Sequence, residues 1–544
     1  MKLAEGLVRC LEHEGVRYIF GLPGEENMAI LDSLNDSSIT FVMVHHEQGA
    51  AFMADVYGRL TGRAGVCLST LGPGATNLIT GVGDAFLDRV PMVALTGQVS
   101  RDRMHKESHQ YVDMEAIFHP ITKWNTLLQK PEVLPEIVRK AFKVAEQEKP
   151  GPTHLDIPED VAAMEIDCEP LAIKEMQEPE PKDSTLREAL ALINNARFPM
   201  ILAGNGVIRS RASNALRRFA EKFQMPVANT FMGKGVMPFD HPLCFMSVGL
   251  QARDYISCGF EKADLVMAIG YDMVEYHPEL WNQNRDKRIV HVDQTPAEVD
   301  ASYVPVIEVL GDIGSSLDRM TEMGRHREGT QSVSILREFI IREIEHFQDD
   351  TSFPMKPQKI IADLRKSLGK KDIVISDVGA HKLWIARMFP CYYPNTCLIS
   401  NGFASMGIAL PGAVSAKMVH PDRKIVAVTG DGGFLMNVQE LETAVRMGNP
   451  FVVLVLNDQS YGLIRWKQLT NYGRATAVDW GPIDFKMLAE SFGARGYRVE
   501  AAQELQPILQ DSLAANQVAV IDCPVDFNEN IRLTEHLGHI VCPI

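Results

Sequence analysis

The residues best suited to chemistry are the segment Gly430-Asp431-Gly432-Gly433 and Asp458, which lies 27 positions beyond Asp431. An apolar, β-branched run over 424–429 precedes the glycines, and a second run over 451–456 precedes Asp458. Apolar residues at helical spacing lie between the two runs, over 437–447. This pattern predicts a strand, a helix and a parallel strand whose carboxyl edge carries both carboxylates. Glycine N–H groups at such an edge suit a phosphate group, and two carboxylates facing a diphosphate suit Mg²⁺.

Gly-Asp-Gly by itself favours a surface turn between two strands over a metal site. The spaced Asp458 and the strand-helix-strand frame favour the metal site. Together they resemble the cofactor motif of thiamine-diphosphate enzymes, which begins Gly-Asp-Gly and ends in Asn-Asn; here the end reads Asn457-Asp458. The resemblance implies that Asp431, Asp458 and the backbone carbonyl of Ser460 hold Mg²⁺.

Glu47 lies between a predicted strand over 39–44 and an Ala-rich helix over 49–60. A carboxylate at the start of a helix is often only a partner of the helix dipole. The runs Gly21-Leu-Pro-Gly24, 46–54 and Gly72-Pro-Gly-Ala-Thr-Asn77, however, resemble the pyrimidine-binding domain of the same enzymes. The resemblance implies that Glu47 is the activating glutamate, hydrogen-bonded to pyrimidine N1′ so that the cofactor can act as its own base.

The resemblance extends over the chain and implies a larger site. Its catalytic residues would be Glu47, Gln110 and Met406, with Met406 as the apolar wedge that bends the cofactor. Taken alone, Gln110 also fits a solvated loop and Met406 also fits core packing. The implied cofactor-binding residues are Pro23, Glu47, Gly72, Asn77, Val378, Gly379, Ala380, His381, Phe403, Met406, Gly430, Asp431, Gly432, Gly433, Asp458 and Tyr461.

With 544 residues, the chain is too long for one core and predicts about three domains. Short apolar runs alternate with helical spacings, which is typical of an α/β fold. We predict three doubly wound α/β domains with mainly parallel sheets. Their ranges are 1–168 for a pyrimidine-binding domain, 185–325 for a central Rossmann-like domain and 350–530 for a diphosphate- and Mg²⁺-binding domain, with a tail over 531–544. A polar, proline-containing linker over 175–183 joins the first two.

The composition, 46% apolar and 23% charged, is that of an ordinary globular protein. A formal charge of −16 argues against nucleic acid and anionic membranes as partners. Without a long apolar run or a signal-peptide pattern, a cytoplasmic location is predicted. The nine cysteines include no Cys-x-x-Cys pair, so they fit neither a disulfide framework nor a zinc site. Cys391 and Cys397 are therefore predicted to be reduced thiols.

Two features bear on the cofactor of the central domain. Gly204-Asn-Gly206 supplies only the first two glycines of a dinucleotide fingerprint. The stretch 270–282 resembles the fermentative, flavin-independent acetolactate synthases among the thiamine-diphosphate enzymes. The resemblance thus implies that FAD is not bound.

The implied reaction is decarboxylation of pyruvate and carboligation to a second pyruvate, giving 2-acetolactate and CO₂. A 2-keto-acid decarboxylase or an FAD-linked pyruvate oxidase would share the thiamine-diphosphate motifs. A flavin or nicotinamide oxidoreductase built on the central sheet is disfavoured by the incomplete glycine fingerprint. Glu47 with the spaced Asp431 and Asp458 disfavours a non-catalytic nucleotide-binding protein.

Glu47 and Asp431 are more than 380 positions apart, so one cofactor must bridge two domains. The family implies a homodimer or homotetramer with the active site at the subunit interface. The second pyruvate is an anion, which a nearby cation would orient. Arg253 and Lys234 are candidates for that role.

Overall fold

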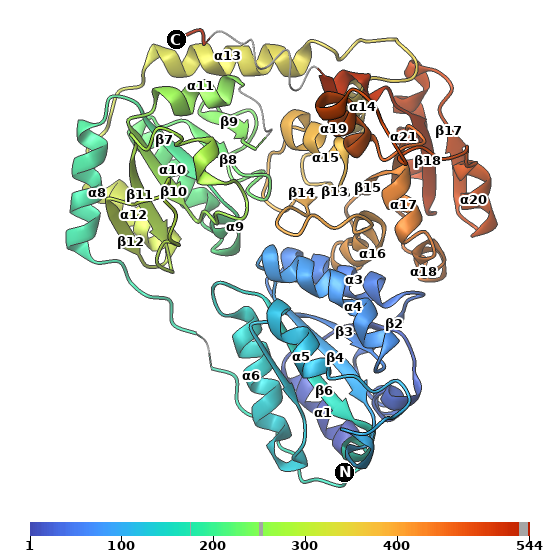
Figure 1. Cartoon of the computed structure of the whole chain (residues 1–544). Helices are drawn as coiled ribbons and strands as arrows, with labels where there is room; N and C mark the ends of the chain where they lie inside the picture. The colour runs from blue at the N-terminus through green and yellow to red at the C-terminus, as the bar shows by residue number, and fades with distance from the viewer. Residues whose placement is uncertain (175, 250–253, 532–541) are drawn as a thin grey trace.

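The computed structural model describes residues 1–174, 176–249, 254–531 and 542–544. These residues form three six-stranded sheets in which neighbouring strands are parallel, with helices packed around each sheet (Figure 1). The predicted α/β fold is confirmed. We call each sheet with its helices the first, middle or third unit. Each sheet lies within one of the three predicted domain ranges.

The first sheet has the order β2-β1-β3-β4-β6-β5. Its strands are β1 (Tyr18–Gly21), β2 (Thr40–Met43), β3 (Gly65–Ser69), β4 (Met92–Gln98), β5 (Trp124–Leu127) and β6 (Pro152–Pro158). Its helices are α1 (Leu3–His13), α2 (Met28–Leu34), α3 (Glu47–Thr61), α4 (Pro73–Leu87), α5 (Met114–Phe118), α6 (Leu134–Glu146) and α7 (Glu159–Ala162).

The middle sheet has the order β12-β11-β10-β7-β8-β9, that of dinucleotide-binding folds, with its switch point between β7 and β10. Its strands are β7 (Pro199–Ala203), β8 (Val227–Asn229), β9 (Cys244–Ser247), β10 (Leu265–Ile269), β11 (Arg288–Asp293) and β12 (Ile307–Leu310). Its helices, with those that lead to the next unit, are α8 (Asp183–Asn195), α9 (Gly206–Arg209), α10 (Ser213–Phe223), α11 (Tyr255–Lys262), α12 (Ile313–Met323) and α13 (Gln331–Glu345).

The third sheet, β14-β13-β15-β16-β18-β17, repeats the strand order of the first. Its strands are β13 (Ile373–Ser376), β14 (Cys397–Ile399), β15 (Ile425–Gly430), β16 (Val452–Asn457), β17 (Arg495–Arg498) and β18 (Ala519–Pro524). Its helices are α14 (Pro357–Ser367), α15 (Ala380–Met388), α16 (Ala409–Val419), α17 (Asp431–Met436), α18 (Glu440–Arg446), α19 (Gly462–Tyr472), α20 (Phe485–Ser491) and α21 (Leu505–Ala514).

Continuous apolar cores join the units. One core contains Phe52 of α3, Leu78 of α4 and Val414 of α16, which are all fully buried. Figure 1 shows α3 directly against α16, with α4 packed against α3. A second core runs from the middle sheet into the third. The edges of the first and third sheets are therefore held in a fixed relation to each other.

The glycine-rich segment differs from the prediction. Gly430 is the N-cap of α17, so the helix begins at Asp431 directly after β15. The helix predicted over 437–447 corresponds to α18, which is shorter and begins only at Glu440. The additional helix α17 ends before it, at Met436. Glycines 432 and 433 thus lie in the first helical turn, where N–H groups have no partner within the helix.

The linker and tail are described only in part. Residues 166–174 and 176–182 contain no helix or strand, and Glu175 lies outside the described residues. Most of the predicted tail, 532–541, also lies outside them. Cys258 and Cys542 form a disulfide, which the sequence analysis did not predict because the cysteines fit no disulfide framework. A separation of 284 residues gives no local spacing signal. The other seven cysteines, including Cys391 and Cys397, are free and buried.

Within the described residues, no helix combines the length and apolar character required to cross a membrane.

Candidate active site

The carboxyl ends of β13, β15 and β16 meet at one edge of the third sheet, because β15 pairs with both neighbours in parallel. Asp377 follows β13, Asp431 follows β15 and Asp458 follows β16. The strand order reverses between β13 and β15, which is where such sheets bind ligands. The structure therefore brings the predicted glycines and both predicted metal ligands to one edge.

Asp431 and Asp458 form an acidic pair at this edge. The Asp431 carboxylate accepts hydrogen bonds from the N–H groups of Gly432 (2.8 Å) and Gln459 (2.7 Å). Burial raises the pKa of Asp431 to about 6, and burial together with the charge of Asp431 raises the pKa of Asp458 to about 7. A cation between the carboxylates would relieve this repulsion.

The donor set fits a hard cation. The described residues hold no group of three or more His, Cys, Asp or Glu side chains that could bind a metal. Two carboxylates with the carbonyl of Ser460, which is 3% exposed, would supply oxygen ligands alone. Such a set suits Mg²⁺, which keeps water ligands and contacts phosphate oxygens.

His381 lies beside the glycines on the first turn of α15. A Cβ atom at Gly379 would lie 2.9 Å from His381 Cε1, and one at Gly430 would lie 3.4 Å from it. Burial lowers the pKa of His381 to about 4, so the imidazole is neutral. Its Nε2 atom is buried without a hydrogen-bond partner among the described residues. Because an unpaired buried polar atom is costly, this atom fits a ligand with phosphate oxygens.

Asp377 connects three parts of this edge. Its carboxylate accepts hydrogen bonds from Val378 N (2.7 Å), Gly407 N (2.8 Å) and Thr429 Oγ1 (2.9 Å). Asp377 thereby fixes the predicted turn over 378–381 relative to β15 and to the segment that contains Met406. Sequence reasoning missed this residue, although an acid directly after a buried strand at a sheet edge was a usable signal.

Tyr461 lies over the glycine segment. Its ring contacts Trp480 edge-on, with ring centroids 4.8 Å apart. A Cβ at Gly432 would lie 2.9 Å from Tyr461 and 3.1 Å from Trp480. Tyr461 is 40% exposed, so part of its surface is accessible to a ligand. Trp480 was not predicted as part of the site.

In the first unit, Glu47 is the first residue of α3 and is 4% exposed. Asn77 of α4 donates a hydrogen bond from Nδ2 to Glu47 Oε2 (2.9 Å). A Cβ at Gly74 would lie 3.1 Å from Glu47 Oε1 and 2.8 Å from Thr70 Cγ2. Glycine at position 74 therefore leaves room for the carboxylate.

The other predicted residues of this unit lie near the same strand ends. Gly72 has φ of +53°, and a Cβ there would lie 2.7 Å from the carbonyl oxygen of Gln110. Gln110 itself is exposed, as is Pro23 after β1. A Cβ at Gly24 would lie 2.4 Å from Thr70, so these segments pack closely.

A residue of the third unit also binds the backbone directly before α3. Glu440, which is fully buried in α18, accepts hydrogen bonds from His45 N (3.1 Å) and His46 N (3.0 Å). The position of Glu47 is therefore fixed from another unit. Sequence reasoning missed Glu440, because its partners lie about 400 positions away and no local pattern marks them.

Of the two candidates for a substrate-orienting cation, Lys234 lies among the described residues. Lys234 is 3% exposed, and its Nζ donates to Ala386 O (2.8 Å) and Ser247 Oγ (3.3 Å). These bonds place Lys234 at the junction of the middle and third units. Arg253 lies outside the described residues.

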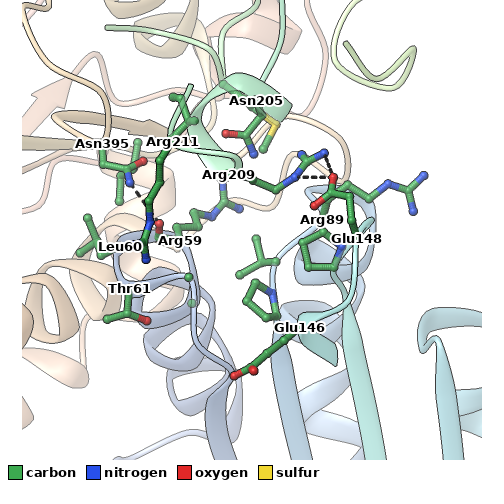
Figure 2. A pocket seen from close by; sticks show the side chains of 18 of the residues that line it. Arg59, Leu60, Thr61, Arg89, Glu146, Glu148, Asn205, Arg209, Arg211 and Asn395 are labelled. Atoms are coloured by element: carbon green, nitrogen blue, oxygen red, sulfur yellow. Dashed lines mark hydrogen bonds and ion pairs between the residues drawn. The ribbon is translucent and has the colours of Figure 1, made fainter. Parts of the chain in front are cut away.

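A cavity of about 220 Å³ lies where the three units meet (Figure 2). Its lining includes Arg59 of α3, Arg209 of α9 and Asn395. None of the predicted cofactor-binding residues lines this cavity. It is therefore distinct from the candidate active site.

Comparison with known proteins finds a separate domain match in each of the three units. Residues 1–117 match the N-terminal TPP binding domain of thiamine pyrophosphate enzymes, residues 186–320 their central domain, and residues 377–523 their C-terminal TPP binding domain. The acidic pair and Glu47 lie in the C-terminal and N-terminal matches respectively.

Similar proteins include acetolactate synthase of Bacillus subtilis (strain 168), 38% identical over 97% of this chain and 94% of that protein. The catabolic acetolactate synthase of Raoultella terrigena is 37% identical over 99% of this chain and 98% of its own length. A probable acetolactate synthase large subunit of Methanocaldococcus jannaschii is 35% identical over 100% of this chain and 96% of its own. The chain belongs to the thiamine pyrophosphate enzymes and, within them, to the acetolactate synthase family.

Proposed function

We propose that this protein joins two molecules of pyruvate, with loss of CO₂, to form 2-acetolactate. The observation that carries the proposal is the oxygen-only acidic pair, Asp431 and Asp458, at the switch point of the third sheet. Beside the pair lies His381 Nε2, which has no hydrogen-bond partner in the described part of the chain. The names of the similar proteins support the choice of reaction.

The residues divide the work as follows. Asp431, Asp458 and the Ser460 carbonyl would hold Mg²⁺, and His381 with glycines 430, 432 and 433 would bind the diphosphate. Thiamine diphosphate, when bound, supplies the electron sink for the pair released as CO₂ leaves. Glu47 would hold a proton between its carboxyl oxygen and the pyrimidine. Its burial keeps water from competing for that hydrogen bond.

Two further roles are part of the proposal. Met406, Phe403 and Tyr461 would contact the cofactor with apolar surface, and Gln110 would reach the reacting atoms. Hydrogen bonds of Glu47 stay within the first unit and those of Asp431 within the third. A homodimer or homotetramer, in which subunits complete each other's sites, stays a prediction that rests on the family. A cytoplasmic location also stays a prediction.

We also propose that the middle unit binds no FAD. Glu275 supports this, because its carboxylate accepts hydrogen bonds from Asn205 N (3.1 and 3.2 Å) and from Thr230 Oγ1. A Cβ at Gly204 would lie 2.3 Å from the Gly270 carbonyl oxygen. The glycine loop at the switch point thus packs against the chain's own backbone and an internal carboxylate, where a pyrophosphate would otherwise approach.

The fate of pyruvate tests the proposal. Purified protein with thiamine diphosphate, Mg²⁺ and pyruvate is expected to release CO₂ and form acetolactate, detected as acetoin after acidification, with no bound flavin. Acetaldehyde as the main product would instead show a decarboxylase, and flavin reduction would show an oxidase. Unconsumed pyruvate would refute the assigned substrate.

A further inference from the structure

A buried ionic cluster in the first unit contacts the loop that precedes α16. Arg59 of α3 is 8% exposed and pairs with Asp55 (2.5 Å), Asp84 (3.1 Å) and Asp88 (2.7 Å). All three carboxylates are buried, with 0% or 1% of each residue exposed. Asp84 lies in α4 and Asp88 is its C-cap, so the cluster joins the ends of the two helices.

Two of the carboxylates bind the loop of the third unit. Asp88 accepts hydrogen bonds from the backbone N–H groups of Asn401 (3.0 Å) and Gly402 (2.5 Å). Asp84 accepts from Ser400 Oγ (2.7 Å) and Ser405 N (3.3 Å). The acceptors and donors are more than 310 positions apart in the sequence.

Arg59 itself contacts the same segment. Its Nη1 donates to the carbonyl of Ile399 (3.1 Å), and Asn395 Nδ2 donates to the Arg59 carbonyl (3.3 Å). Figure 2 shows Arg59 and Asn395 side by side at the cavity between the units. By contrast, Asp55 makes no hydrogen bond to residues 399–407 in the described part of the chain.

The loop so held contains two predicted cofactor-binding residues. Gly407, at its far end, donates its N–H to Asp377 (2.8 Å), so the loop is fixed from both sides. Between the anchors lie Phe403, which is 45% exposed, and the half-buried Met406. The Phe403 ring lies over α4, where a Cβ at Gly83 would be 3.2 Å from it.

We propose that Asp84 and Asp88 are positioning residues that set the conformation of residues 399–407, and through it the placement of Phe403 and Met406 against thiamine diphosphate. The proposal rests on the proposed function for its second half. The carboxylates touch neither substrate nor cofactor; they act through the loop. Hydrogen bonds to charged groups are the strong ones, so exchanging the Asp88 carboxylate, which accepts from two backbone N–H groups, for an amide weakens the anchor.

Asp55 provides a matched control, because it pairs with the same arginine and is equally buried. Hydrogen-exchange mass spectrometry of the variants without cofactor tests the loop directly. In Asp88→Asn, the amides of residues 401 and 402 are expected to exchange about tenfold faster or more, and in Asp84→Asn that of residue 405. In Asp55→Asn, exchange over 399–407 is expected to stay within about twofold of wild type.

Titration of thiamine diphosphate at saturating Mg²⁺, followed by tryptophan fluorescence, tests the second half. Asp88→Asn is expected to raise the dissociation constant about tenfold, and Asp55→Asn about twofold or less. Equal exchange, or equal cofactor affinity, in Asp88→Asn and Asp55→Asn would overturn the proposal. If Asp88→Asn does not fold, Ser400→Ala takes its place, since it removes a donor to Asp84 without uncovering a charge.

The outcomes separate this proposal from the proposed function. A wild-type protein that binds thiamine diphosphate but forms no acetolactate would refute the reaction while the comparison of Asp88→Asn with Asp55→Asn still decides the positioning role. Unchanged loop exchange in an active enzyme would refute the positioning role alone.

Discussion

The substitution Glu47→Gln separates catalysis from folding. Glutamine has nearly the same shape, and its amide oxygen can still accept the hydrogen bond from Asn77 Nδ2, now 2.9 Å from the carboxylate. Glu47 is 4% exposed, so the change removes a buried charge that one neutral donor contacts. We expect the free energy of unfolding to stay constant or to rise by up to about 1 kcal/mol.

Catalysis should respond much more strongly. An amide cannot exchange a proton with the pyrimidine, and a positioned acid or base contributes a factor of about 10² to 10⁴. The expected fall in kcat by that factor corresponds to about 2.7 to 5.5 kcal/mol of activation free energy. The catalytic loss therefore exceeds any change in stability several times.

The assay measures acetolactate formation at saturating pyruvate, thiamine diphosphate and Mg²⁺, with urea unfolding of the same preparation. Glu440→Gln is the matched control, because Glu440 holds the same helix start through His45 N and His46 N. We expect it to lose about 1 to 3 kcal/mol of stability while kcat stays within about tenfold of wild type. A kcat of Glu47→Gln within tenfold of wild type would refute the role of Glu47. A loss of stability as large as that of Glu440→Gln would show that Glu47 serves the fold.

Further expectations follow from single contacts. Gly74→Ala, whose Cβ would lie 3.1 Å from Glu47 Oε1 and 2.8 Å from Thr70 Cγ2, should cost about 1 to 3 kcal/mol in urea unfolding and lower kcat as well; unchanged kcat would show that Glu47 tolerates displacement. Burial raises the pKa of Glu275 from 4.5 to about 8, so its contribution to stability is present below pH 4.5 and is lost as the pH rises to about 8. Glu275→Gln should therefore reduce the fall in the free energy of unfolding between pH 4.5 and pH 8, by no more than about 5 kcal/mol. An unaltered pH dependence in the variant would contradict the raised pKa of Glu275. Thiol titration of the denatured, unreduced chain should give seven thiols, and two more after reduction; nine before reduction would exclude the Cys258–Cys542 bond.

The acidic pair could be predicted because its signals are local. Asp431 and Asp458 each follow an apolar strand, and strands joined by a helical connection end at the same sheet edge. The position of Glu47 at a strand-to-helix junction was predicted in the same way, because a strand precedes it, but its role was implied by the resemblance of the surrounding motifs to thiamine-diphosphate enzymes. The glycine segment was predicted incorrectly, because the sequence indicated a helix only from residue 437. In the structure Gly430 is the N-cap of α17, so a helix begins directly after β15.

The residues that hold this site in place were not predictable. Glu440 is an ordinary acid at the start of a helix, and only the fold brings His45 and His46 to it from about 400 positions away. Asp84 and Asp88 equally resemble surface acids of an amphipathic helix until Arg59 and the 399–405 loop are seen around them. Their local sequence carries no periodicity or spacing that would name a partner in another unit.

The middle unit shows why strand order alone does not assign a cofactor. Its order and the glycines after β7 are those of a dinucleotide-binding sheet. Yet Glu275 reaches the loop from 70 positions away and accepts hydrogen bonds from Asn205 N, the donor that an anionic ligand would use. Its carboxyl group already occupies that donor and would have to leave its buried partners to admit a pyrophosphate. Removing that carboxylate, as in Glu275→Gln, leaves the strand order untouched, so any gain of flavin binding in that variant would trace to the site and not to the fold.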